Sequence, residues 1–373
     1  MRILHVYKDY YPVLGGIENH VRVLAEGQAA AGHDVTVLVT NTAPVTRVEM
    51  LDGVRVIKAG RLAHVASTPL SLGLPWQLAR LKPQITHLHF PYPVGEVAQY
   101  LLGRGEHTVL SYHSDVVRQQ AILRFYRPLM RRVLRSIDRI LVATPNYLTS
   151  SEVLQPFRNK CCIVPYGIDR RRFMEVDLAA AQAVRARYAP DGPLLLFVGV
   201  LRYYKGLQYL LEAMPDIPAR LLIAGDGPMA PALREQVRAL GLGSRVILAG
   251  RVPDEELPAY YHAADLFVLP SGERSEAFGL VLVEAMSAGL PVVSTELGTG
   301  TSYVNKQGES GVVVPAQNPQ ALAQAINALL ADEPLRQRLA AGALARSALF
   351  DREPMLAQIE QVYAKLVAGK SRG

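Results

Sequence analysis

Short apolar runs alternate with helix-length segments along almost the whole chain, and this alternation constrains the fold more than any other feature. The runs are rich in Val, Ile and Leu and mostly lack polar–apolar alternation. Parallel strands that are covered on both faces have this pattern. A first series occupies residues 2–7, 35–40, 54–58, 85–89, 108–113, 140–143 and 161–165, and a second occupies residues 194–200, 220–224, 246–249, 266–269, 292–294 and 312–314. The pattern predicts an α/β protein with two doubly wound parallel sheets.

A turn-forming segment, Pro-Asp-Gly-Pro at residues 190–193, precedes the second series. We predict a Rossmann-like first domain over residues 1–172, a linker over 173–192 and a Rossmann-like second domain over 193–351. Residues 352–373 have a helical period, and we expect this helix to cross back onto the first domain. Since ligands of such sheets bind at the carboxyl ends of the strands, we expect a site in a cleft between the domains.

Composition narrows the class of protein. Half of the 373 residues are apolar and 20% are charged, which excludes a disordered chain. No apolar run approaches the ~18 residues of a membrane span, and the first strand lacks the features of a signal peptide, so we expect a cytoplasmic protein. Cys161 and Cys162 are adjacent and build neither a disulfide framework nor a metal site. The net charge of +7 favours anionic partners.

Two loops that follow first strands have the ingredients of a phosphate site. Gly15 and Gly16 lie between the first strand and a helix, where the backbone can approach a phosphate closely. Arg202 and Lys205 directly follow the strand that opens the second series, and two such cations can clamp a diphosphate. The alternatives are a plain tight turn for the glycines and a solvated basic pair for the cations.

The segment from residue 275 to 286 is the most informative. Glu276 and Glu284 stand eight residues apart and bracket Gly279, which opens a very apolar helix. A charge inside such a helix is costly without a partner, so we expect Glu284 to face a ligand or another side chain. The amides of Gly279, Leu280 and Val281 form a helix N-terminus that suits phosphate. The alternative is that both carboxylates are structural.

Other residues give weaker signals. His113 ends a strand and points toward the expected cleft, although a hydrogen-bonded structural histidine is the common alternative. Gly225 and Gly227 match part of a dinucleotide pattern, but the following strand carries no acidic ribose ligand. His87 and His89 alternate on one strand without a third ligand nearby in sequence, so we expect no zinc site. The chain contains no Asp-x-Asp pair, and we expect no metal.

Seven arginines lie between Arg118 and Arg139, with apolar residues at helical spacing among them. A basic amphipathic helix of this kind can lie on an anionic membrane. The alternative is a surface helix whose apolar stripe faces the core. Pro128 must start a second helix or kink the first. Aromatic residues do not interleave with the arginines, so we expect no nucleic-acid partner.

Taken in order, these motifs resemble the retaining glycosyltransferases of family four, which have the two-Rossmann GT-B architecture. The resemblance covers nearly the whole chain, and its most specific part is the Glu276-x7-Glu284 segment. The segment after His113 and residues 298–305 look like those of bacterial O-antigen and exopolysaccharide mannosyltransferase-like members.

The resemblance implies a role for each motif. Arg202 and Lys205 would bind the donor diphosphate, and His113 would contact the donor sugar near the reacting carbon. Glu284 would hydrogen-bond the ribose, and Glu276 with the amides after it would hold the sugar and phosphate. The catalytic set is thus His113, Arg202, Lys205 and Glu276, and the donor-binding set is Gly15, Gly16, Gly225, Gly227, Phe278, Gly279, Leu280, Val281 and Glu284.

These roles imply a metal-independent transferase without a cofactor. It would move a hexose from a nucleotide diphosphate sugar, of the GDP-mannose type, to a lipid-linked or glycan acceptor at the inner face of the cytoplasmic membrane. Fixed cations and helix-end amides would stabilise the leaving phosphate in place of a metal. The alternatives are a nucleotide-sugar epimerase with the same two-domain plan, an NAD(P)-dependent oxidoreductase, and a binding module without catalysis.

Overall fold

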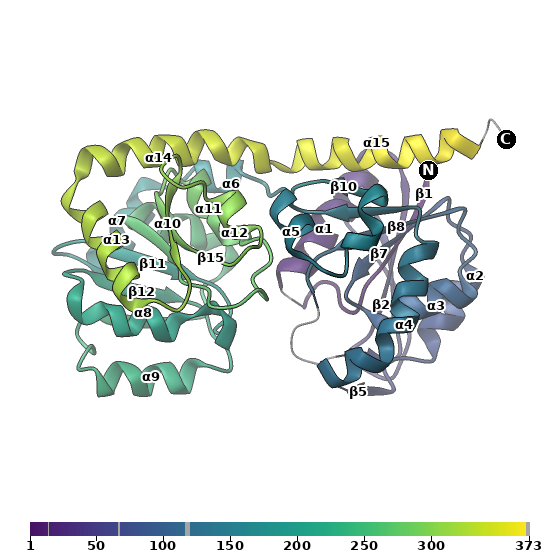
Figure 1. The fold of residues 1–373 in the computed structure, drawn as a ribbon, viewed down its shortest axis with the longest axis horizontal. Coiled ribbons are helices and arrows are strands. Elements are labelled where there is room, and N and C mark those ends of the chain that lie inside the picture. Colours follow the sequence, from purple (N-terminus) through teal and green to yellow (C-terminus); the bar gives the residue numbers. More distant parts are fainter. Residues whose placement is uncertain (14, 66–67, 116–119, 371–373) are drawn as a thin grey trace. The chain divides into compact units, whose positions relative to one another are not determined.

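A computed structural model of the chain describes residues 1–13, 15–65, 68–115 and 120–370. The chain divides into two compact units (Figure 1). The first contains residues 1–167 together with 352–373, and the second contains residues 168–351. Each unit is an α/β structure built on one large sheet. In the described residues no helix has both the length and the apolar character that crossing a bilayer requires.

The first unit is built on an eight-stranded sheet with the order β10-β9-β8-β7-β1-β2-β4-β3. Its strands are β1 (Arg2–Val6), β2 (Asp34–Thr40), β3 (Arg47–Leu51), β4 (Val54–Ala59), β7 (Ile85–Phe90), β8 (His107–Tyr112), β9 (Arg139–Val142) and β10 (Cys161–Ile163). All neighbours are parallel except β3 and β4. A hairpin of β5 (Ala63–Val65) and β6 (Thr68–Leu70) stands apart from this sheet.

Helices of this unit alternate with the strands. They are α1 (Gly16–Ala30), α2 (Gly73–Arg80), α3 (Pro93–Leu102), α4 (Gln120–Ser136) and α5 (Pro145–Ser150), and α15 (Arg352–Lys370) joins them from the end of the chain. One apolar cluster connects α1 and α15 to four neighbouring strands, and it contains Ile3, Leu24, Ile85, Val109, Leu141, Val164, Met355, Ile359 and Tyr363. The C-terminal helix therefore belongs to the hydrophobic core of the first unit.

The second unit has a six-stranded, fully parallel sheet with the order β13-β12-β11-β14-β15-β16. Its strands are β11 (Leu194–Val198), β12 (Arg220–Ala224), β13 (Val246–Gly250), β14 (Leu266–Leu269), β15 (Val292–Glu296) and β16 (Gly311–Pro315). Every residue of β11 and β14 is buried, which explains their continuous apolar runs. The expected α/β class with two doubly wound parallel sheets is thereby confirmed.

Helices cover the second sheet as well. They are α6 (Arg171–Met174), α7 (Leu178–Tyr188), α8 (Leu207–Ala213), α9 (Ala230–Ala239), α10 (Leu257–Ala263), α11 (Leu280–Ser287), α12 (Thr301–Val304), α13 (Pro319–Ala331) and α14 (Glu333–Ser347). Residues 173–192, which we expected to form a linker, belong to the second unit, because α7 packs against α10 there. Arg185 holds it there through an ion pair of 2.7 Å with Asp265. The second unit accordingly begins at Ile168.

Residues 120–136 of the arginine-rich segment form the single helix α4, with Pro128 inside it, and Arg139 begins β9. Met130, Val133, Leu134 and Ile137 bury one stripe in the first unit, as expected for a surface helix. Arg124, Arg127, Arg131, Arg132 and Arg135 are exposed. Phe125 stands among them and is 86% exposed, although its spacing predicts the buried stripe. Arg118 lies outside the described residues.

Candidate active site

A buried ion pair lies at the carboxyl end of the second sheet. Lys205 ends a short turn that follows β11, and Glu276 lies in the loop between β14 and α11. The Lys205 Nζ and Glu276 Oε2 atoms are 2.6 Å apart, and the two side chains are 11% and 10% exposed. Strand β11 has β12 on one side and β14 on the other, so the pair lies where the strand order reverses. Open α/β sheets bind their ligands at this point.

The surroundings hold both side chains of the pair in place. Burial alone would lower the pKa of Lys205, but the negative charge of Glu276 and its hydrogen bond raise that pKa overall, so the ammonium is charged at neutral pH. The Ser271 hydroxyl donates to Glu276 Oε2 at 3.4 Å, and the Thr299 hydroxyl donates to the Glu276 carbonyl at 2.7 Å. The pair is therefore held in place at the edge where open α/β sheets bind their ligands.

Gly206 makes this pairing possible. Its φ is 69°, in the left-handed region, and a Cβ at this position would lie 2.0 Å from the Pro270 carbonyl oxygen. The turn that carries Lys205 thus touches the loop after β14 backbone to backbone. Arg202, at the start of the same turn, is exposed. The structure brings Lys205 and Glu276 together and leaves the Arg202 side chain in solvent.

Glu284 lies in α11 and has a partner inside the same unit. Its Oε2 accepts a hydrogen bond of 2.6 Å from the Tyr261 hydroxyl. Burial raises the pKa of Glu284, while the Tyr261 hydrogen bond and the charge of Arg172 oppose that rise. The expectation that a carboxylate in so apolar a helix needs a partner is thus met by Tyr261. A ligand role for Glu284 stays a prediction.

The loop before α11 is held by packing. Gly279 is the N-cap of the helix with a φ of 82°, so the amides of Leu280 and Val281 lie in the first turn, where a helix leaves its N–H groups without intrahelical partners. The Phe278 ring is buried and meets Phe350 edge to face, with the ring centroids 5.7 Å apart. Its side chain therefore anchors the loop, and the donor contacts of these residues stay predictions.

Gly225 and Gly227 have a packing role in the structure. A Cβ at Gly225 would lie 2.0 Å from the Gly199 carbonyl oxygen, and one at Gly227 would lie 2.7 Å from the Leu201 amide nitrogen. Their φ angles are 151° and 159°. The two glycines let the loop after β12 lie directly on the loop after β11, and a donor contact through their backbone stays a prediction.

In the first unit, Gly15 and Gly16 begin α1 directly after the β1 loop. Strand β1 stands between β2 and β7, so this helix start is at the reversal point of its own sheet. His113 follows β8 and is 3% exposed. Its Nε2 lies 3.1 Å from His89 Nδ1, and its Nδ1 lies 2.5 Å from the Tyr166 hydroxyl. Both ring nitrogens thus have partners within the first unit.

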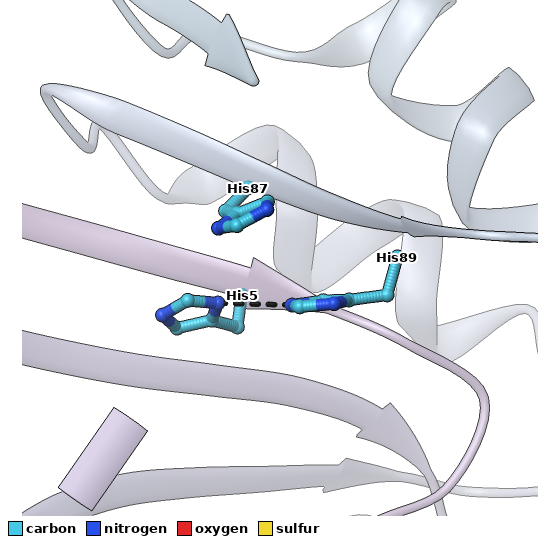
Figure 2. Close-up of side chains that lie close together, drawn as sticks. All are labelled: His5, His87 and His89. Atoms are coloured by element: carbon cyan, nitrogen blue, oxygen red, sulfur yellow. Dashed lines mark hydrogen bonds between the residues drawn. The ribbon is translucent and has the colours of Figure 1, made fainter. Parts of the chain in front are cut away.

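Sequence reasoning missed the cluster that these contacts belong to. His5 on β1 lies close to His87 and His89 on β7 (Figure 2), and His20 and His113 join them. Two groups of three, His5/His87/His89 and His20/His89/His113, bring ring nitrogens within 4.8 Å of one another. The prediction that His87 and His89 have no third potential ligand beside them is therefore wrong, because adjacent strands and α1 supply such neighbours.

Burial keeps these imidazoles neutral. It lowers the pKa of His5 to about 4 and that of His20 to about 3, and it lowers the pKa values of His87, His89 and His113 well below the usual range. His5, His87, His89 and His113 use both ring nitrogens in hydrogen bonds. In the described part of the chain, the buried ring nitrogens of His20 have no hydrogen-bond partner.

Comparison with known proteins identifies the family of the chain. Family models for "Glycosyltransferase Family 4" and "Glycosyl transferases group 1" match residues 14–172 and 182–346. The chain is 40% identical to the D-rhamnosyltransferase WbpZ of Pseudomonas aeruginosa over 87% of this chain and 86% of the relative. It is 34% identical to the O-antigen chain mannosyltransferase C of Escherichia coli over the full length of both.

The solved structures agree on the fold. The sucrose-phosphate synthase of Thermosynechococcus elongatus superposes with a TM-score of 0.83 at 27% identity, covering 98% of this chain and 99% of that one. The lipopolysaccharide glycosyltransferase WaaG superposes with a TM-score of 0.70 at 18% identity, covering 97% and 99%, and supports the fold alone. The predicted GT-B class is confirmed. The chain belongs to glycosyltransferase family 4, the group 1 glycosyl transferases, and is a glycosyltransferase.

Proposed function

We propose that this glycosyltransferase moves a hexose, with retention of the anomeric configuration and without a metal ion, from a nucleotide diphosphate sugar to a lipid-linked or glycan acceptor of a cell-surface polysaccharide. The buried Lys205–Glu276 pair at the reversal point of the second sheet carries this proposal. A permanent cation and a fixed acceptor group stand side by side at an edge where ligands of such sheets bind. They suit a donor that is anionic at one end and rich in hydroxyls at the other.

The bond changes balance without a further reactant. The bond between the anomeric carbon and the phosphate oxygen breaks, and its electron pair stays on the phosphate. The acceptor oxygen bonds to the same carbon from the same face, and its proton passes to a phosphate oxygen. Lys205, Arg202 and the amides at the start of α11 stabilise the charge that develops on the leaving nucleoside diphosphate. Glu276 accepts hydrogen bonds from hydroxyls of the donor sugar.

The relatives suggest the class of donor and acceptor. The full-length relative from Escherichia coli is named an O-antigen chain mannosyltransferase, and WbpZ is named a D-rhamnosyltransferase. We infer a donor of the GDP-mannose type and an acceptor in O-antigen or related polysaccharide synthesis, at the inner face of the cytoplasmic membrane. The relatives offer no support for the epimerase alternative.

A panel of nucleotide sugars tests the proposal. Purified protein is incubated with each donor, with and without a lipid-linked glycan acceptor, in excess EDTA. We expect transfer from one donor class, with the same anomeric configuration in product and donor. Strict dependence on an added divalent ion, or inversion, would contradict the corresponding part of the proposal. If the donor is epimerised in the reaction without acceptor, the protein is a nucleotide-sugar epimerase and the transferase proposal is wrong.

We also propose that α4 holds the protein on an anionic membrane. Phe125, 86% exposed, stands among five exposed arginines of this helix, which are Arg124, Arg127, Arg131, Arg132 and Arg135. An apolar ring surrounded by cations suits the boundary between headgroups and acyl chains. The buried stripe of α4 keeps the helix attached to its own unit while this face meets the lipid.

Vesicle binding tests this part separately. We expect binding to anionic vesicles that weakens as salt is added, and weaker binding for Phe125→Ser and for Arg131→Glu. Arg238→Glu, an exposed arginine of α9 in the second unit, serves as the charge-matched control. Equal binding to neutral and anionic vesicles would remove the membrane proposal and leave the transferase proposal intact.

A further inference from the structure

Five polar side chains form one continuous hydrogen-bonded row through the core of the first unit, which we call the imidazole chain. It runs from Gln28 through His5, His89 and His113 to Tyr166. Gln28 Oε1 lies 2.7 Å from His5 Nε2, His5 Nδ1 lies 3.1 Å from His89 Nε2, His89 Nδ1 lies 3.1 Å from His113 Nε2, and His113 Nδ1 lies 2.5 Å from the Tyr166 hydroxyl. Figure 2 shows the link between His5 and His89.

The geometry of the rings indicates that an N–H···N hydrogen bond, and not a metal ion, joins each pair of neighbouring imidazoles. The planes of His89 and His113 differ by only 8°, and their centroids are 5.3 Å apart. The centroids of His5 and His89 are also 5.3 Å apart. Two imidazoles that share an in-line N–H···N bond of 3.1 Å have about this separation, since each nitrogen lies roughly 1.1 Å from its ring centre. A metal between two nitrogens would require the rings to tilt away from this line.

A row of neutral imidazoles has a single direction. Each ring has one N–H and one lone pair, so every link must point the same way. The Gln28 carbonyl oxygen can only accept, and therefore His5 donates from Nε2, His89 donates from Nε2, and His113 donates from Nε2 to His89. Tyr166 then donates its hydroxyl proton to His113 Nδ1. One amide at the far end thus sets the tautomer of three histidines.

The amide end is anchored by the C-terminal helix. Gln28 Nε2 donates to the Tyr363 hydroxyl at 3.5 Å, and that hydroxyl bonds His87 Nδ1 at 2.6 Å. His87 Nε2 in turn lies 2.8 Å from the Ser111 hydroxyl. Gln28 and Tyr363 are 4% and 0% exposed, so water does not compete for these groups. Helix α15 therefore helps to hold the Gln28 amide in the orientation that fixes the row.

We propose that Gln28, His5 and His89 are positioning residues that hold His113 as the Nε2–H tautomer with its ring fixed against β7 and its Nδ1 as a hydrogen-bond acceptor. The kinetic part of this inference rests on the proposed function and on the role that the family resemblance implies for His113, contact with the donor sugar. The structural part does not, because it concerns the protein without ligand. Hydrogen-bond partners that orient metal-binding histidines change activity by about 10- to 100-fold when they are altered, and we expect an effect of similar size here.

The direct test is nuclear magnetic resonance of protein labelled with ¹⁵N in its histidine rings. In the wild-type protein at neutral pH, we expect His5, His89 and His113 to carry protons on Nε2 alone. Protonation at Nδ1, a charged imidazolium, or a metal-shifted nitrogen accompanied by stoichiometric transition metal would overturn the proposal. This measurement needs no variant and no substrate.

Gln28→Glu provides the perturbation. A carboxylate at this position would favour the imidazolium form of His5, which then donates from Nδ1 and reverses every link beyond it. We expect His89 and His113 to switch to the Nδ1–H form and kcat/KM to fall on the order of tenfold. Gln84→Glu is the matched control, since Gln84 accepts from the Arg2 amide in the same unit outside the imidazole chain.

The outcomes separate the two proposals. Unchanged tautomers in a folded Gln28→Glu protein would overturn the imidazole chain as a device that sets His113, whatever the activity. Switched tautomers with unchanged kcat/KM would overturn its role in transfer. If the variant does not fold, the wild-type spectrum decides. Expected tautomers in a protein that transfers no sugar from any donor would contradict the proposed function and leave the assignment of the tautomers intact.

Discussion

Replacing Lys205 by Met tests the buried pair most informatively, because it removes the charge and keeps much of the side-chain volume. Opposite charges about 4 Å apart attract by about 4 kcal/mol where the effective dielectric constant is near 20. Lys205 and Glu276 are closer than this, at 2.6 Å, and both are about nine-tenths buried. Removal of one partner leaves the other charge buried, which typically costs about 3–5 kcal/mol.

We therefore expect Lys205→Met and Glu276→Gln each to lower the opening free energy of the second unit by about 3–5 kcal/mol. The double variant should lose less than the sum, with a coupling of about 2–3 kcal/mol. Hydrogen exchange of amides in β11 and β14 measures this for the second unit by itself. Additive effects, with a coupling under about 0.5 kcal/mol, would show that the pair contributes nothing in solution.

Activity provides the second half of this prediction. If Lys205 stabilises the leaving phosphate, Lys205→Met should lower kcat by about 10²–10³-fold, which is typical when a group that stabilises developing negative charge is removed. The hydrogen-exchange measurement shows whether a loss of activity is due to unfolding of the second unit or to loss of the Lys205 charge. A folded Lys205→Met protein with wild-type kcat would refute the assignment of Lys205 to the leaving group.

Three further predictions concern single side chains. Tyr261→Phe removes the hydrogen bond to Glu284, and we expect a nucleoside diphosphate to bind about tenfold more weakly when its affinity is measured by calorimetry. Unchanged affinity would show that the Tyr261–Glu284 pair has no part in donor binding. Burial raises the pKa of Glu96 to about 7, so the folded state retains a proton that the unfolded state loses from about pH 4.5. Stability should therefore fall by about 3 kcal/mol as pH rises from about 4.5 to 7, and Glu96→Gln should lack this contribution when hydrogen exchange of the two proteins is compared. His20→Leu removes two buried ring nitrogens without hydrogen-bond partners, so we expect the variant to be about 1–3 kcal/mol more stable at pH 7. Because the pKa of His20 is lowered to about 3, the variant should also lose less stability than the wild-type protein on acidification. Destabilisation at pH 7 would indicate a partner for His20.

The sheets were predictable because their strands are buried on both faces. Strands such as β11 are read directly as apolar runs, and Gly32, with a φ of 86°, lies just beyond the end of α1, where the left-handed conformation favours glycine. Strand β3 was missed, since it is an antiparallel edge strand whose residues are largely exposed and form no apolar run. The segment predicted to be a linker contains α7, and the docking of α7 on α10 depends on tertiary contacts that no local pattern shows.

The sequence predicts the individual residues of the candidate site but not which of them contact one another. Lys205 and Glu276 each follow a strand, which marks them as candidates, but their pairing depends on β11 and β14 being neighbours. The imidazole chain depends in the same way on β1, β7 and β8 being adjacent, with His5 opposite His87 in the β1–β7 register. No spacing within one strand reveals such a cluster. Strand order, once known, would have placed these histidines on one face.

A crystal structure with a nucleoside diphosphate bound would show whether leaving-group charge is captured at this site. We expect phosphate oxygens within about 3 Å of Lys205 Nζ and of amides at the start of α11, with Arg202 turned toward the same group. Phosphates bound at another edge of the second sheet, with the Lys205–Glu276 pair untouched, would contradict it.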